Sequence, residues 1–150
     1  MIEIKRMDAS HIDGVLEIEN TCFDEPWSRK SIEEQLSNPN AHYFVLTENG
    51  KVAAYGGIWQ ILDECDINNI GVLEDKRRKG YGGQILEALI DYMQKEELTC
   101  INLEVKTTNY PAIALYKKYG FYENGLRKKY YRGTEDALIL RRDRVEHSGN

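Results

Sequence analysis

The hydrophobic period of the chain changes at Gly80, and this change restricts the fold more than any other feature of the sequence. Before it, apolar residues lie in short runs typical of strands. After it, one long stretch carries apolar residues at helical spacing, namely Tyr81, Ile85, Leu86, Leu89, Ile90 and Met93. A buried strand pattern returns at Thr99 to Val105. A strand, a long helix and another strand in succession predict a sheet with some parallel pairing.

Turns, helix caps and alternating apolar residues predict the remaining elements. Asn49-Gly50 indicates a tight hairpin turn. Asp8, Ser28 and Asn109 are good N-cap residues, and each stands before a helical pattern. We expect strands over residues 2–7, 42–47, 52–61, 65–72, 99–105, 121–131 and 137–141, with helices after Asp8, Ser28, Gly80 and Asn109. The order β-α-α-β-β-β-α-β-α-β-β predicts an α/β fold with a mixed sheet.

Length and composition predict one soluble unit. The chain has 150 residues and no long linker, so we expect a single domain over residues 1–150 whose polar tail frays after about residue 143. Its longest apolar run, Ala112 to Tyr116, falls far short of the roughly twenty residues of a membrane span. The first residues lack a signal-peptide pattern, and three scattered cysteines suggest neither disulfides nor a metal site. We expect a cytoplasmic protein without membrane contact or metal.

A basic, glycine-rich loop precedes the long helix. Lys76-Arg77-Arg78-Lys79 runs directly into Gly80-Tyr81-Gly82-Gly83, in the form R-x-x-G-x-G. Glycines let the backbone approach a ligand, and the first turn of a helix offers unpaired N–H groups, so a diphosphate is a suitable guest. The net charge of −5 argues against nucleic acid as the anionic ligand. Taken alone, the loop is equally well explained as a basic turn with a glycine-assisted helix start.

Several short motifs, in order along nearly the whole chain, resemble those of the GNAT N-acetyltransferases. They are Asn69-Ile70-Gly71-Val72, Arg77-x-x-Gly80-x-Gly82, Leu103-Glu104-Val105-Lys106, Asn109, Ala112-Ile113-Ala114-Leu115-Tyr116 and Gly120-Phe121. Three further segments are similar to the bacterial ribosomal-protein-alanine N-acetyltransferases, namely Pro26-Trp27-Ser28, Arg127-Lys128-Lys129-Tyr130-Tyr131 and Glu135-Asp136-Ala137. The resemblance implies a single-domain GNAT fold with a mixed, mostly antiparallel sheet and helices on both faces. It also implies acetyl-CoA as cosubstrate and the N-terminal alanine of a small-subunit ribosomal protein as acceptor.

The resemblance also assigns roles to individual positions. It places acetyl-CoA binding on Ile70, Gly71, Val72, Arg77, Arg78, Lys79, Gly80, Tyr81, Gly82, Gly83 and Asn109. It makes Glu104 the general base and Tyr116 the general acid. Some positions depart from the family pattern. Lys106 replaces an arginine, Tyr110-Pro111 replaces two small residues, and Gly71 replaces an alanine.

These residue types suit amide formation from a thioester, although each has a plainer explanation. A carboxylate can take the proton of an amine, and a tyrosine can donate to a departing sulfur. Without the resemblance, Glu104 is a strand-end carboxylate paired with a lysine, and Tyr116 is a core aromatic residue. Asn109 is equally an N-cap. Tyr130-Tyr131 is either part of the substrate lip or an edge strand.

The acceptor and the oligomeric state are less constrained by the sequence. The alternatives are a GNAT enzyme acting on a small amine or a lysine side chain, and a non-catalytic CoA-binding module. Ribosomal proteins are basic, so we expect a cationic second or third residue of the acceptor to meet Glu25, Glu135 or Asp136. The plain alternative is that these acids only solvate the surface.

Overall fold

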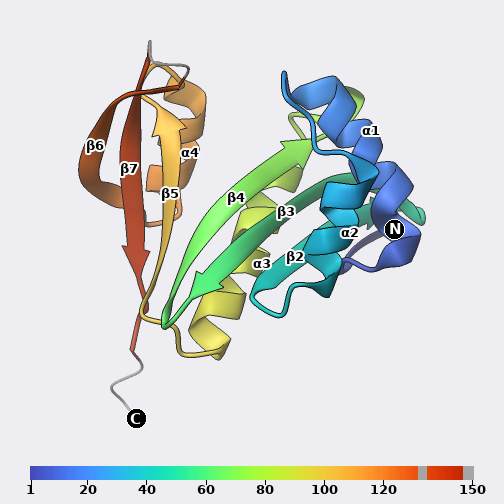
Figure 1. The fold of residues 1–150 in the computed structure, drawn as a ribbon, viewed down its shortest axis with the longest axis horizontal. Helices are drawn as coiled ribbons and strands as arrows, with labels where there is room; N and C mark the ends of the chain where they lie inside the picture. The colour runs from blue at the N-terminus through green and yellow to red at the C-terminus, as the bar shows by residue number, and fades with distance from the viewer. Residues whose placement is uncertain (132–134, 147–150) are drawn as a thin grey trace.

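The computed structural model describes residues 1–131 and 135–146, apart from the side chains of residues 129–131. Its strands form one seven-stranded sheet in the order β1-β2-β3-β4-β5-β7-β6 (Figure 1). They are β1 (Ile2–Arg6), β2 (Ala41–Glu48), β3 (Lys51–Ile61), β4 (Glu64–Val72), β5 (Cys100–Lys106), β6 (Tyr122–Tyr131) and β7 (Glu135–Asp143). The α-helices are α1 (Ile12–Cys22), α2 (Arg29–Ser37), α3 (Tyr81–Lys95) and α4 (Tyr110–Lys118). The expected order of elements and the mixed α/β fold are confirmed.

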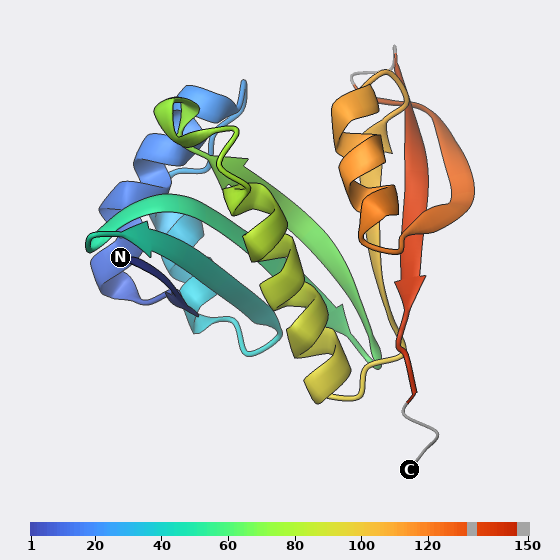
Figure 2. The same ribbon diagram turned by 180° about the vertical axis from the view of Figure 1, so that it is seen from behind.

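Helices cover both faces of the sheet. Helices α1 and α2 lie on one face, and α3 and α4 lie on the other (Figures 1 and 2). The helical stripe expected from Tyr81 to Met93 packs into the core on the α3 side, where Ile85, Leu86 and Leu89 are fully buried. A second core, which contains Val15 and Ile18, lies under α1 and α2. Helices α1, α2 and α3 thus bury apolar side chains against the sheet, and α4 packs partly buried ones against the core on the α3 side.

One strand pair differs from all the others and opens the sheet. Every described pair is antiparallel except β4 with β5, which is parallel. This pair spans only Glu64 to Asp66 on β4, opposite Cys100 to Asn102 on β5. Beyond these residues the two strands diverge, as Figure 1 shows. The diverging halves leave main-chain groups of both strands without a strand partner.

A bulge in β4 lies beside this opening. Gly57 of β3 pairs with Asn69, whereas the next residue, Ile58, pairs with Ile67, so Asn68 is an extra residue in β4. The extra residue shifts the alternation of side chains along the strand. Ile67 and Ile70 therefore both pack on the α3 side of the sheet, and Asn69 reaches toward α1. The bulge thus places an amide side chain on the α1 side just where the sheet opens.

The two ends of the chain differ in detail from the expectation. Asp8 caps a short 3-10 helix, Ala9–His11, and α1 begins only at Ile12, because the His11 side chain accepts from the Asp8 N–H at 3.0 Å and closes a capping box. After β7, Arg144 N–H donates to the Thr99 carbonyl at 2.9 Å, and residues 147–150 lie outside the described part. Among the described helices none is long and apolar enough to cross a membrane.

Candidate active site

A cleft of about 750 Å³ occupies the space between the diverging strands β4 and β5. Four of the residues singled out from the sequence line it, namely Ile70, Glu104, Asn109 and Tyr116. They come from β4, β5, and the beginning and interior of α4. The fold therefore brings the expected base, the expected acid and part of the expected cofactor site into one cleft.

Glu104 reaches this cleft because of its place in β5. It stands two residues beyond Asn102, the last residue of β5 that pairs with β4, and alternation puts both side chains on the same face. Its side chain is 26% exposed, and its Oε1 lies 3.0 Å from the Arg127 guanidinium of β6. The plain alternative for Glu104 was a lysine partner; the ion pair in the structure is with an arginine, which the antiparallel β7–β6 pair brings across from a distant part of the chain. This ion pair fixes the direction of the carboxylate within the cleft.

Tyr116 is held by packing rather than by polar contacts. Its ring meets the Phe121 ring edge-on, with 5.7 Å between centroids. Burial raises the pKa of Tyr116 above its ordinary value, so the hydroxyl stays protonated through the neutral range. Within the described part of the chain no side chain hydrogen-bonds to this hydroxyl. Its proton is therefore available to a group in the cleft.

Asn109 caps α4, and its place in the cleft leaves the expected contact with the cofactor open. Its Oδ1 accepts from the Ala112 N–H at 3.3 Å, and Pro111 stands in the first turn of α4. The same side chain lines the cleft. Capping uses the oxygen of the amide and leaves its nitrogen as a donor toward a ligand.

The basic loop leads into the N-terminus of α3, which is accessible to a ligand. Gly80 has φ +81° and is the N-cap of α3, and in the described chain no side chain caps this end. The first-turn N–H groups of Tyr81, Gly82 and Gly83 are therefore free to bind an anion, with the helix dipole adding to the attraction. A Cβ built on Gly82 would meet only Val72 Cγ2, at 3.6 Å. The backbone is accessible here, so a diphosphate fits.

The charges of this loop are mostly engaged by the protein itself. Glu48 of β2 lies 2.7 Å from Lys76 Nζ and 3.7 Å from Lys79 Nζ, and its Oε2 accepts from the Tyr81 hydroxyl at 3.0 Å. The hydrogen bond from Lys76 is the main cause that lowers the pKa of Glu48. Arg77 donates to the Val72 carbonyl at 3.3 Å. An anion here would thus be bound chiefly through the main chain. The sequence did not predict Glu48 as a partner of this loop, because Glu48 lies in β2 and no local pattern connects the two segments.

Gly71, which was expected to lie near the ligand, also allows close packing between β4 and α1. It is buried, and a Cβ built on it would lie 2.6 Å from Ile18 Cγ2 of α1. Glycine replaces the usual alanine because α1 approaches β4 closely at this point. Its neighbour Ile70 faces the cleft.

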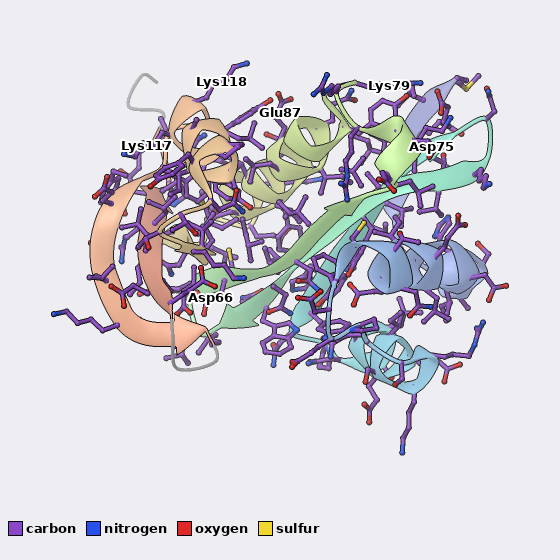
Figure 3. The ribbon with its side chains drawn as sticks, turned by 90° about the horizontal axis from the view of Figure 1, so that it is seen from above. Asp66, Asp75, Lys79, Glu87, Lys117 and Lys118 are labelled. Carbon is purple, nitrogen blue, oxygen red and sulfur yellow. The ribbon has the colours of Figure 1, made fainter. Side chains whose placement is uncertain are left out.

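The other residues of the cleft lining were not assigned a role from the sequence, although Asn69, Leu103, Val105, Lys106 and Ala112 belong to the motifs of the resemblance. They include Cys22, Phe23, Asp24, Trp59, Asp66, Asn68, Asn69 and Asn102. Figure 3 shows Asp66 on the opposite side of the sheet from Glu87 of α3 and Lys117 of α4. The cleft therefore also extends to the side of the sheet that α1 and α2 cover. The resemblance at Pro26-Trp27-Ser28 and the expectation for Glu25, both just after residues 22–24, pointed toward this region.

The acids expected to meet the acceptor, Glu25, Glu135 and Asp136, do not themselves line the cleft, and their contact with an acceptor stays a prediction. Glu135 forms an ion pair with Lys106 at 3.5 Å and accepts from the Thr108 hydroxyl at 3.3 Å. The described carboxylates that line the cleft are Asp24, Asp66 and Glu104 instead of Glu25, Glu135 and Asp136. The side chains of Tyr130 and Tyr131, expected at the lip, lie outside the described part of the chain.

Comparisons with known proteins agree with this geometry. The model of the acetyltransferase (GNAT) family matches residues 12–121. The ribosomal protein bS18-alanine N-acetyltransferase of Escherichia coli strain K12 is 38% identical over 145 residues, which cover 93% of this chain and 96% of that protein. The N-alpha-acetyltransferase RimI of Mycobacterium tuberculosis is 34% identical, with 93% and 89% covered.

A solved structure gives the same result. The crystal structure of the ribosomal-protein-S18-alanine N-acetyltransferase from Escherichia coli superposes with a TM-score of 0.89 at 34% identity, covering 100% of this chain and 99% of that one. The single-domain GNAT fold with a mixed, mostly antiparallel sheet, which the motifs implied, is thereby confirmed. The chain belongs to the GNAT acetyltransferase family and is an acetyl-CoA-dependent N-acetyltransferase similar to the bacterial ribosomal-protein-alanine enzymes.

Proposed function

We propose that this enzyme acetylates the N-terminal α-amine of a protein, alanine before other first residues, and that its acceptor is a small-subunit ribosomal protein met in the cytoplasm. The observation that carries the proposal is the shared cleft of Glu104 and Tyr116, which reaches both the α3 side and the α1 side of the sheet. Two substrates can therefore approach from opposite sides. The name of the E. coli relative supports a ribosomal-protein alanine as acceptor, and the name of the M. tuberculosis relative supports an α-amine.

On the α3 side, the chain offers the groups that acetyl-CoA requires. The diphosphate is bound by the main chain of Arg77 to Gly83 at the N-terminus of α3, and Arg78 adds positive charge. The Asn109 amide and the main chain of Ile70 to Val72 hold the pantetheine arm. Acetyl-CoA supplies the acetyl group as a thioester. Main-chain N–H groups of β4 beyond Asp66, left without a strand partner, polarise the thioester oxygen.

Glu104 and Tyr116 move the protons. An α-amine has a pKa of about 7.7 to 8.0, so roughly a tenth of it is neutral at pH 7. Glu104 accepts the remaining proton, directly or through one water. Tyr116 donates its proton to the departing sulfur, and burial keeps that proton on the hydroxyl until it is needed. Transfer is direct, without a covalent enzyme intermediate.

Replacing Gly82 by valine is expected to weaken acetyl-CoA binding at least tenfold, about 1.4 kcal/mol. Because the built Cβ meets only Val72 at 3.6 Å, the fold can accept the side chain. The added methyl groups stand over the N–H groups of the first turn, where the diphosphate approaches. Calorimetric titration with acetyl-CoA measures the loss.

The matched control is Gln84→Val, which places the same side chain on α3 two residues further on, about half a turn around the helix. It is expected to bind acetyl-CoA as the wild type does. A Gly82→Val protein that melts like the wild type and binds with unchanged affinity would show that the diphosphate lies elsewhere.

The acceptor is tested with peptides. We expect kcat/KM for an Ala-Arg N-terminus to exceed that for Ala-Glu about tenfold at low salt, because Asp24, Asp66 and Glu104 line the cleft. The advantage should shrink at high salt, since screening weakens attraction between partly exposed charges. Initial rates followed by mass spectrometry measure both effects. Equal rates for both peptides, or faster acetylation of a lysine side chain, would favour the alternative acceptors.

A further inference from the structure

One buried carboxylate plays no part in the reaction described above. Glu19 of α1 is only 1% exposed. Its Oε1 accepts from the Trp27 backbone N–H at 2.8 Å, and its Oε2 accepts from Asn69 Nδ2 at 3.2 Å and from the Tyr55 hydroxyl. Among the described residues no Lys, Arg or His forms an ion pair with it. A carboxylate buried in this way is costly unless its hydrogen bonds are satisfied, and here three donors satisfy it.

Two of these donors belong to separate parts of the cleft wall. Trp27 lies in the segment between α1 and α2, whose residues Phe23 and Asp24 line the cleft. Asn69 directly follows the bulge of β4 and lines the cleft itself. Glu19 therefore fixes the α1–α2 segment and the bulged strand relative to each other. Both parts lie on the side of the sheet from which the acceptor approaches.

The same contacts fix the orientation of the Asn69 amide. Burial is the main cause that raises the pKa of Tyr55, so its hydroxyl stays protonated and donates to Glu19. Nδ2 of Asn69 donates to Glu19 and also lies 3.3 Å from the Tyr55 oxygen. Since Nδ2 is engaged on this side, Oδ1 is the atom that Asn69 retains for a group in the cleft. An amide oxygen accepts from N–H donors and cannot donate.

We infer that Glu19 is a positioning residue for the acceptor, which holds the α1–α2 segment in place and turns the Asn69 oxygen toward the N–H groups of the incoming peptide. The inference rests on the proposed function, because it needs a peptide acceptor on this side of the sheet. Acetyl-CoA binds at the N-terminus of α3, on the other side. Its binding should not depend on Glu19.

The test is the Glu19→Gln variant, assayed with both substrates varied. Glutamine keeps one oxygen for the Trp27 N–H, but it then presents an N–H group to Asn69. The Asn69 amide must turn over to accept it, and its own nitrogen then faces the acceptor. We expect KM for an Ala-Arg peptide to rise about tenfold, whereas KM for acetyl-CoA and kcat change less than about twofold.

A rescue separates positioning from general stability. In Glu19→Gln combined with Asn69→Asp, the amide and the carboxylate exchange places, and position 69 again presents an oxygen to the cleft. This double variant should recover most of the peptide KM. Tyr55→Phe removes one donor from the network and should raise the peptide KM less. Met93→Ala, in the core on the α3 side, should lower the melting temperature without changing the peptide KM.

Three results would overturn the inference. They are an unchanged peptide KM in Glu19→Gln, a double variant no better than the single one, and a Met93→Ala protein whose peptide KM rises equally. If Glu19→Gln does not fold, the double variant and Tyr55→Phe test the inference through the same three quantities, namely KM for the peptide, KM for acetyl-CoA and kcat. Failure of the proposed function is distinct, because the wild type would then acetylate none of the N-terminal peptides.

Discussion

Replacing Glu104 by glutamine is expected to lower kcat about 100-fold at pH 7, the usual size of an acid–base contribution. Glutamine has nearly the same shape and keeps an oxygen toward Arg127, 3.0 Å away, but it cannot accept a proton. The deficit should shrink as the pH rises from 7 to 9, because an amine with a pKa of about 7.7 to 8.0 then loses its proton without help. Stopped assays with acetyl-CoA and an N-terminal alanine peptide across this range measure the effect.

The matched control is Glu123→Gln in β6. Glu123 pairs with Lys117 on the surface, 2.7 Å away, and does not line the cleft. The Glu123→Gln variant should keep wild-type turnover at every pH. A Glu104→Gln protein with full activity from pH 6 to 9 would remove Glu104 from the role of base.

Replacing Tyr116 by phenylalanine is expected to lower kcat roughly 10- to 100-fold with little change in acetyl-CoA affinity. The ring contact with Phe121 remains, so the loss comes from the missing proton donor. Because burial raises the pKa of Tyr116, the wild-type hydroxyl should stay competent well above neutral pH. Single-turnover rates and calorimetric binding of acetyl-CoA separate the two quantities.

Tyr92→Phe provides the comparison for this variant. The Tyr92 hydroxyl lies 3.1 Å from His42 Nε2, away from the cleft, so its loss should leave kcat unchanged. Unchanged turnover in Tyr116→Phe, or a large loss of acetyl-CoA affinity, would contradict the role of general acid.

Local features of the chain could be predicted from the sequence because their causes are local. Ser28 and Asn109 cap α2 and α4 as expected, because their side-chain oxygens accept hydrogen bonds from the N–H groups three residues onward. Asn49-Gly50 makes the expected turn, with φ of +53° and +84°. The order of helices and strands followed from the same kind of signal.

Features that depend on pairing between distant segments could not be predicted. The bulge at Asn68 exists only in relation to β3, so no pattern within β4 reveals it. Arg127 meets Glu104 because β7 lies between β5 and β6, and chain order does not give that arrangement. In α1 the apolar Leu16 is only partly buried, whereas the charged Glu19 is almost fully buried because Tyr55 and Asn69 lie opposite.

The short β4–β5 pair gives this sheet four edges instead of two. Two of these edges belong to the outer strands, β1 and β6. The other two are the edges that β4 and β5 turn toward each other beyond Asp66 and Asn102. Proteins usually cover or shorten a free strand edge, because its main-chain donors and acceptors attract other chains. Here two such edges face each other inside the molecule and can bind an extended partner through its backbone. Hydrogen bonding between backbones does not depend on side-chain identity. Substitution of a few residues that line the cleft is therefore enough to change the preferred acceptor of such an enzyme, without any change in the sheet.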